Sequence, residues 1–420
     1  MSVEPLTSRN DAEHSAQLAQ SRTGPAGSER ETLARSHGRL RRRIGLASYL
    51  WAGGYLLLWI LLDLAAQAVE LLPGGAQSHW ALQLLLIAGL FGGGFWVWSA
   101  PFGYVQGHVL PRRFGLSAQS AAGFLADQVK SAVISAVLLL PILLALYGLL
   151  RLAGPWWWLW MAGLLAALAL FTTFIAPVLL LPLFYRVRPL GDDQPALAGS
   201  IMELARSNGV HVMGVYRMQT SAKTTTANAA LAGLGRTRRI LLADNLLDHF
   251  DPEEVRAVVA HELAHHVHRD IPRLLSVNLV LAVLGLWAAA MAVNLLAPLT
   301  GAENAADPRA MPLLLAVLTL TGLLTAPLDT AVSRNREFAA DRFACEVLGT
   351  GEPMARALER LASRNLAEVT PPAWTVLFAS HPPIARRIAR ARGYRPEPAE
   401  NGSAGPAPFR SASPGPTPTG

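Results

Sequence analysis

The segment His261-Glu262-Leu263-Ala264-His265 combines residue types and a spacing that can bind and activate a metal ion. On an α-helix, residues four positions apart project from one face, so the imidazoles of His261 and His265 can bind the same ion. Glu262 adjoins the first histidine, and its carboxylate can take a proton from a water molecule at the ion without binding the ion itself. This pattern is typical of zinc metallopeptidases, with Glu262 as the general base.

A catalytic zinc ion needs a third protein ligand and an open fourth position. The best candidate is Glu337, which is predicted to lie on a separate helix after the last apolar segment. Asp341 lies four residues further on the same helical face, where its carboxylate could accept the second ring N–H of a ligating histidine. The alternative for both acids is an exposed helix face with alternating acidic and basic residues. With Glu337 as third ligand, the sequence predicts one Zn²⁺ per chain.

The helix that carries the two histidines has its own start signal. Asp251 is in the N-cap position, Pro252 is in the first helical position and Glu254 follows three residues after the cap, so a helix is predicted from there through about His268. Upstream, the pattern predicts a helix over 195–207 and short strands over 215–218, 224–231 and 239–242. The histidine helix therefore belongs to a small polar subdomain with a β-sheet.

The rest of the chain is too apolar for an ordinary soluble protein, because 52% of its 420 residues are hydrophobic and 15% are charged. Six segments are long and apolar enough to cross a hydrocarbon core of about 30 Å. They lie near 45–67, 80–100, 131–150, 156–184, 272–296 and 311–330. The predicted fold class is therefore a mostly α-helical, multi-pass membrane protein with about six transmembrane helices and a small β-sheet.

Basic residues mark one side of the membrane. They occur at 41–43 before the first span, at Arg112 and Arg113 between the second and third spans, and again after the fourth span. The loops predicted on the opposite side, at 68–79, 151–155 and 297–310, carry only Arg151 and Arg309. Because loops on the cytoplasmic side are enriched in Lys and Arg, we expect the catalytic segments to be cytoplasmic. The membrane expected for the protein is the plasma (inner) membrane.

Polar and apolar segments divide the chain into six parts. These are a disordered tail (1–38), a membrane domain with four spans (39–185), a cytoplasmic subdomain with the histidine helix (186–271), a two-span hairpin (272–330), a second catalytic segment with the third ligand (331–394) and a disordered tail (395–420). Both tails hold too few apolar side chains to offset the entropy lost on ordering.

Together, His261, Glu262, His265, Glu337 and Asp341 resemble the motifs of the type I CAAX prenyl endopeptidase family, integral-membrane metallopeptidases with soluble and heat-shock-type relatives. The resemblance covers about 100–393, and further matching segments are Tyr104 to Lys130, Pro182 to Tyr185, His381-Pro382-Pro383 and Arg387-Ile388. It implies a gluzincin-like catalytic subdomain with zinc on His261, His265 and Glu337. It also implies that Glu262 is the catalytic base and that Asp341 is the partner of a ligand.

The resemblance implies further roles for Asn228, His381 and Arg387. Asn228 falls where the family has an edge strand that pairs with an extended substrate, a mode of binding that makes little demand on sequence. His381 and Arg387 would stabilise the oxyanion or hold a substrate carboxylate, because a cationic donor beside developing charge favours the transition state. The alternatives are a turn residue at 228, and a helix that starts at Pro382 and has an exposed basic face.

These features predict a membrane-embedded zinc metalloendopeptidase that hydrolyses peptide bonds of membrane-associated or lipidated proteins or peptides, similar to CAAX proteases. The expected partners are such a substrate and the lipid bilayer, with no nucleic acid, and the oligomeric state stays open. Thr226, Ala227 and Ala230 replace the His, Ser and aromatic residue that the family often has around Asn228, so the substrate stays open as well. The alternatives are a quality-control protease for membrane proteins and a non-catalytic membrane scaffold with a vestigial metal site. A transporter is disfavoured because the spans hold few ionisable residues.

Overall fold

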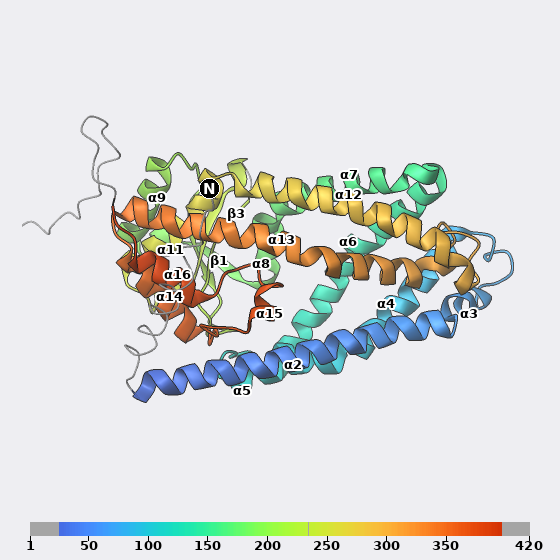
Figure 1. Ribbon diagram of the computed structural model, residues 1–420, viewed down its shortest axis with the longest axis horizontal. Coiled ribbons are helices and arrows are strands. Elements are labelled where there is room, and N and C mark those ends of the chain that lie inside the picture. The colour runs from blue at the N-terminus through green and yellow to red at the C-terminus, as the bar shows by residue number, and fades with distance from the viewer. Residues whose placement is uncertain (1–24, 234, 397–420) are drawn as a thin grey trace, which may run out of the picture.

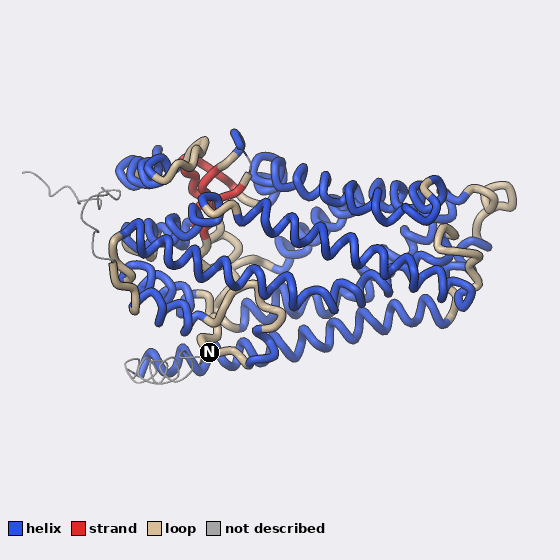
Figure 2. Tube along the Cα trace, turned by 45° about the horizontal axis from the view of Figure 1, so that its top comes forward, coloured by secondary structure: helices blue, strands red, loops and turns tan. Residues whose placement is uncertain are grey.

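The computed structural model describes residues 25–233 and 235–396 and has two parts (Figure 1). Long helices run side by side, and a four-stranded sheet with shorter helices lies at one end of them (Figure 2). The expected fold class, a mostly α-helical chain with six candidate membrane spans and a small sheet, is confirmed. The predicted C-terminal tail, 395–420, lies outside the described residues from position 397 onward.

Six helical segments of the described chain are long and apolar enough to cross a membrane. They are α2 (Pro25–Leu61), α4 (Trp80–Tyr104) with α5 (Leu110–Arg113), α6 (Ala121–Leu152), α7 (Trp157–Ile175) with α8 (Leu181–Phe184), α12 (Asp270–Leu296) and α13 (Met311–Leu348). A short π-helical turn at Val105–Val109 joins α4 to α5, and another at Ala176–Leu180 joins α7 to α8. Each span packs against the next, and α13 returns to contact α2, so the six form a closed ring.

The first helix begins earlier than the sequence predicts. Residues 1–38 are expected to be a disordered tail, but α2 starts at Pro25, and what precedes Pro25 lies outside the described residues. Tertiary contacts order this part of α2: Ala34 is buried, and the ring of His37 packs against Phe114 with their centroids 5.0 Å apart. Because these partners are distant in sequence, local composition could not show the contact.

The helix that carries Glu337 is also longer than predicted. Instead of a span over 311–330 followed by a separate helix, α13 runs without a break from Met311 to Leu348. At the other side of the hairpin, α12 begins at Asp270, directly after α11 ends at Val267. The position of Glu337 is therefore set by a membrane span.

The sheet has the strand order β1-β2-β4-β3, with β2 and β4 parallel and the two outer pairs antiparallel. Its strands are β1 (Arg186–Pro189), β2 (Val215–Gln219), β3 (Ala229–Ala232) and β4 (Arg239–Ala243). The predictions at 215–218 and 239–242 are confirmed, whereas β1 was not predicted. The strand predicted over 224–231 starts only at Ala229, because the buried carboxylate of Asp244 holds the preceding chain in a loop through the backbone N–H groups of Thr220 and Ser221.

One hydrophobic core joins two distant stretches of chain, within 190–263 and 344–391. The helices around it are α9 (Pro195–Ser207), α11 (Pro252–Val267), α14 (Glu352–Arg364) and α16 (Ile384–Arg392). Three short helices complete the described chain: α3 (Leu64–Glu70), α10 (Asp244–Leu247) and α15 (Ala373–Val376). The predicted capping box of α11 is present, with the N–H of Asp251 donating to Glu254 Oε2 at 3.0 Å. The segment that follows the membrane hairpin thus folds back onto the segment that precedes it.

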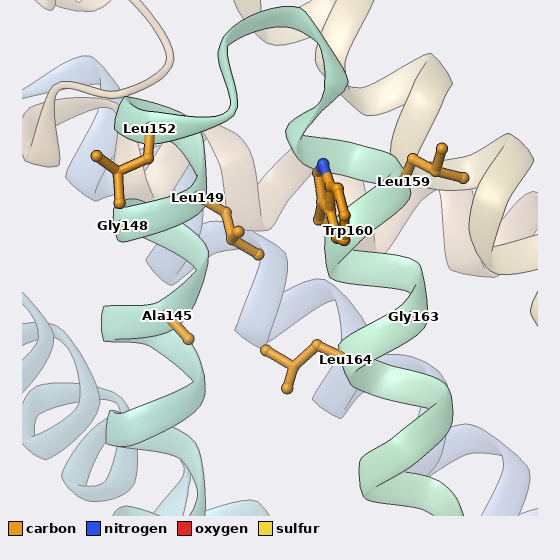
Figure 3. A pocket seen from close by; sticks show the side chains of 8 residues that line it. All are labelled: Ala145, Gly148, Leu149, Leu152, Leu159, Trp160, Gly163 and Leu164. Carbon is orange, nitrogen blue, oxygen red and sulfur yellow. The ribbon is translucent and has the colours of Figure 1, made fainter.

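A second core closes the ring at the end far from the sheet, around Trp59, Tyr147 and Leu314. Figure 3 shows an apolar groove between α6 and α7 at that end. It is lined by Ala145, Gly148, Leu149, Leu152, Leu159, Trp160, Gly163 and Leu164. These side chains include no acid, base or nucleophile.

Gly351, at the start of α14, fixes how closely α14 and α16 approach. A Cβ at this position would lie 1.7 Å from the carbonyl oxygen of Ala391 in α16. We expect Gly351→Ala to push the two helices apart and to destabilise the protein by about 1–3 kcal/mol. Thermal unfolding in detergent, followed by tryptophan fluorescence, should show a clear fall in midpoint. Gly199→Ala in α9, where the added Cβ meets nothing within 4 Å, is the matched control and should not lower the midpoint; equal midpoints for the two variants would contradict this reading.

Candidate metal centre

Three side chains from two adjacent helices meet where the sheet joins the ring. His261 and His265 lie on α11, and Glu337 lies on α13, which packs beside it. One nitrogen of each histidine and one oxygen of Glu337 are within 4.8 Å of one another. Glu337 Oε2 is 3.5 Å from His261 Nε2, and Glu337 Oε1 is 3.6 Å from His265 Nε2. The structure therefore brings together the three residues that the sequence suggested as ligands.

The other ring nitrogen of each histidine contacts a buried aspartate. Asp341 Oδ1 lies 3.0 Å from His261 Nδ1, and Asp270 Oδ2 lies 3.0 Å from His265 Nδ1. A carboxylate at Nδ1 favours the tautomer with the proton on that nitrogen, which leaves the lone pair on Nε2. Both lone pairs are thereby directed to the side on which Glu337 lies.

Asp270 is the residue of this site that sequence reasoning missed. It is the first residue of α12 and only 1% exposed. The chain turns sharply at Arg269, whose φ is 55°, and this turn places Asp270 against His265 on the preceding helix. Arg336 Nε on α13 is 3.7 Å from Asp270 Oδ1. In the sequence, the feature that could have indicated Asp270 is its position, since it is an acid that lies between the histidine helix and the next apolar segment.

The geometry of the three donors fits a small metal ion. In a tetrahedral site with ligand bonds of about 2.0–2.1 Å, ligand atoms lie about 3.3 Å apart, close to the observed 3.5 and 3.6 Å. His381 Nδ1 and Arg387 Nη1 approach Glu337 Oε2 at 2.7 and 3.2 Å, but this buried oxygen has no partner with hydrogen-bond geometry. A bound cation would satisfy it.

The electrostatics of the site also favour a cation. Burial lowers the pKa of His261, but the nearby carboxylates of Asp341 and Glu337 outweigh burial and raise this pKa to about 9. The surrounding carboxylates thus stabilise positive charge at the Nε2 position. A divalent ion there would take the place of the proton.

Arg387 on α16 is buried behind the donors. Its Nε and Nη2 donate to the two oxygens of Asp341 at 2.8 and 2.7 Å, a bidentate pair. His381 lies in the loop before α16, and its side chain is 63% exposed although it touches Glu337. The structure therefore brings both residues to the site, but only His381 presents a largely open surface.

Glu262 is half-buried on α11, between the two histidines in sequence. Desolvation raises its pKa, and the charges of His261 and His265 and the backbone N–H of Leu231 in β3 partly offset that rise. The carbonyl of Leu231 lies 3.4 Å from Nε2 of His266, one turn further on. The edge strand β3 is thus connected to the histidine helix at Leu231.

Asn228 directly precedes β3 and is exposed. Its carbonyl accepts the N–H of Ala243 in β4 at 3.0 Å, and its side-chain oxygen accepts the N–H of Ala229 at 2.9 Å. The hydrogen bonds described for Asn228 are local, with none to the three donor residues. Its place at the start of an edge strand agrees with the position expected from the sequence.

The ring of spans and a metal-binding group that includes the His-Glu-x-x-His helix define this chain as an integral-membrane metalloprotease. Residues 192–395 match the family model of peptidase family M48, and residues 27–186 match the model described as CAAX prenyl protease N-terminal, five membrane helices. Four of the six candidate spans lie in this second region. The chain belongs to peptidase family M48.

Similar proteins extend the match over most of the chain. An uncharacterized metalloprotease of Bacillus subtilis, YhfN, is 30% identical over 290 residues, which cover 68% of either chain. A CAAX prenyl protease 1 homolog of Arabidopsis thaliana is 29% identical over 310 residues, covering 71% of this chain and 72% of the relative. The crystal structure of S. mikatae Ste24p has the same fold, with a TM-score of 0.78 and 22% identity over 91% of this chain and 95% of that one. The protein is a membrane metalloprotease of the CAAX-protease type.

We expect Asp270→Ala to weaken metal binding about 10- to 100-fold, the usual effect of removing the residue that orients a ligating histidine. The reason is that His265 would lose the contact that fixes its Nδ1 proton and its ring plane. Competition of the purified protein with a metal chelator measures the change. Asp248→Ala removes an equal charge from an exposed carboxylate paired with Arg217 and should leave the affinity unchanged. Equal affinities for the two variants would rule out this role for Asp270.

Proposed function

We propose that the metal is zinc, with one ion per chain bound by His261, His265 and Glu337. The observation that carries the proposal is that both Nε2 atoms face one carboxylate while each Nδ1 is held by an aspartate. Imidazole binds several first-row metals, but two imidazoles and one carboxylate with a free fourth position are the donor set of catalytic zinc in peptidases. When bound, zinc would polarise the scissile carbonyl and acidify a water molecule.

Glu262 is the proposed general base. The raised pKa of its half-buried carboxylate makes it a better proton acceptor near neutral pH than an exposed glutamate. The N–H of Leu231 holds the carboxylate in place beside the histidines. Glu262 would take a proton from the attacking water and return it to the amine that leaves when the peptide C–N bond breaks.

His381 and Arg387 receive different roles in this proposal. The ring of His381 is close to Glu337 and largely exposed, so it can face a bound substrate and donate to the developing oxyanion. Arg387 is buried and bidentate on Asp341, which in turn holds His261. We therefore assign Arg387 and Asp341 to positioning the metal ligands.

The substrate is proposed to bind as an extended strand along the edge of β3, starting at Asn228 and ending before Leu231, whose main-chain groups contact Glu262 and His266. The bond from Ala243 to the carbonyl of Asn228 faces β4, so in this antiparallel pair the main-chain groups of Ala229 point away from the sheet. The next outward-facing residue, Leu231, contacts Glu262. Strand addition would thus lay a peptide directly beside the proposed base.

Membrane-anchored or lipidated proteins and peptides are the proposed substrates. Support comes from relatives named CAAX prenyl protease 1, and from the direct passage of α11 into the span α12. Quality control of membrane proteins is the alternative within the protease class. A scaffold with a vestigial metal site is the alternative without turnover.

The catalytic side is proposed to be cytoplasmic and the membrane to be the plasma (inner) membrane. Arg112 and Arg113 end the second span, and residues 41–43 lie midway along α2, where Arg42 contacts Glu368 of the catalytic part. Both positions agree with the enrichment of Lys and Arg on the cytoplasmic side. We keep the predicted division of the chain, in which 186–271 and 331–394 form the catalytic part around the hairpin 272–330.

Replacing Glu262 with Gln tests the mechanism. We expect cleavage of a peptide substrate by the purified protein in detergent to fall about 10²- to 10⁴-fold, because the base is lost while the metal donors remain. Metal content, measured in the same samples, should stay at the wild-type level. Glu253→Gln changes an exposed glutamate of the same helix and should cleave normally. Equal cleavage by the Glu262→Gln variant and the wild type would contradict the mechanism, and unchanged cellular function of that variant would favour the scaffold.

A further inference from the structure

The four arginines of α16 fall into two pairs. Arg387 binds Asp341 and Glu337, and Arg392 binds Glu352 and Glu359. Arg386 and Arg390, one helical turn apart, form no salt bridge with any described residue. Two cations on one helix face repel each other unless an anion lies between them.

These two guanidinium groups line a pocket of about 340 Å³ between α13 and α16. The ring of Phe338 also lines the pocket: the Cζ atom of Arg390 lies 3.8 Å from the ring centroid and that of Arg386 lies 5.9 Å from it. Stacking on one ring limits the motion of both side chains. The pocket is therefore a preformed site for a group with two or more negatively charged oxygens, which guanidinium groups bind well.

A third arginine shapes the pocket wall. Arg334 Nη1 donates to the carbonyls of Val376 and Ala379 at 2.8 and 3.0 Å. Thr330 Oγ1 donates to the carbonyl of Leu377 at 2.6 Å. These bonds fix the loop around α15 against α13, and Figure 1 shows α15 beside that helix.

The pocket lies beside the metal centre, since Pro382 and Pro383 follow His381, and it reaches round α13 to the face opposite Glu337. Asn335, which lines the pocket, and Glu337, which faces the histidines, are two positions apart and so point to nearly opposite sides of the helix. Leu324 and Leu328 share the face of Asn335 and are 70% and 60% exposed. The pocket thus continues an apolar helix face that is suited to contact with lipid.

The pocket lies about one headgroup layer beyond the exposed leucines of α13. Arg334 lies six residues beyond Leu328, about 9 Å along the helix, and the headgroup layer extends about 5–8 Å beyond the hydrocarbon. The adjacent loop exposes Trp374, Leu377 and Phe378, as expected of side chains at a membrane interface. Basic groups therefore lie just beyond an apolar surface.

We propose that Arg386 and Arg390 bind the phosphate of an anionic phospholipid, whose acyl chains lie along the Leu324 and Leu328 face of α13. The headgroup lies over Phe338 between the two guanidinium groups and neutralises their repulsion. A lipid is favoured over a substrate carboxylate because exposed apolar side chains, on α13 and in the loop around α15, continue from the pocket. The proposal does not depend on which metal or substrate the enzyme uses.

The test measures binding of short-chain phosphatidylglycerol to the full-length protein in detergent by native mass spectrometry, with phosphatidylcholine and inorganic phosphate as competing probes. We expect the double variant R386Q/R390Q to bind phosphatidylglycerol at least about tenfold more weakly than the wild type, because two charge-assisted contacts are lost. The variant R386K/R390K keeps the charge and should retain part of the binding. R206Q/R392Q removes the same charge outside the pocket and should bind as the wild type does.

Three outcomes would overturn the proposal. Equal phosphatidylglycerol binding by all four proteins would show that the pocket is not the lipid site. Displacement of the lipid by an equal concentration of inorganic phosphate would identify a site for free phosphate instead. A raised KM for an acidic peptide in R386Q/R390Q, with lipid binding unchanged, would assign the pocket to the substrate. Thermal midpoints of all variants show whether each one is folded.

Discussion

The buried carboxylate of Glu337 is the constraint on which the rest of this structure depends. Taking a carboxylate out of water costs several kcal/mol unless opposite charge and hydrogen bonds replace the water. Here the compensation comes from His261 and His265 on another helix, and from the cation that the three donors together fit. Because α12 and most of α13 separate the donors in sequence, the site closes only when the membrane hairpin has folded back.

Each buried charged group of the site has a partner of opposite charge, and these partners connect the metal ligands to other helices. Asp341 holds His261 and is itself held by Arg387, so α16 is tied to the metal centre. Asp270 holds His265 and lies near Arg336, so the start of one span is tied to the other. The hydrophobic core that joins 190–263 with 344–391 supports the same closure. The packing of the two halves and the geometry of the site therefore depend on each other.

Local patterns in the sequence were enough to predict several parts. The spacing of His261 and His265, the cap at Asp251 and the six apolar segments each act within a few helical turns. The histidine helix and six candidate spans are present, although the first and last spans differ from the predicted bounds. Glu337 was selected from its position after a span, and it does lie against the histidines.

Features that depend on distant contacts could not be predicted. The start of α2 is ordered by Phe114, and the edge strand β1 pairs only with β2. Asp270 reaches His265 through a backbone turn with positive φ at Arg269, a conformation that nothing in the residue type indicates. The continuity of α13 was missed because the change from apolar to polar residues was interpreted as a helix end. In each case the missing information was tertiary.

Zinc content of the purified protein tests the central claim, that Glu337 completes the metal site, most directly. Elemental analysis after dialysis against a weak chelator should compare the wild type with Glu337→Gln. The matched control is Glu346→Gln, which changes an exposed glutamate of the same helix. The account predicts about one zinc ion per chain for the wild type and for Glu346→Gln, and little for Glu337→Gln. Full retention of zinc by Glu337→Gln would contradict it.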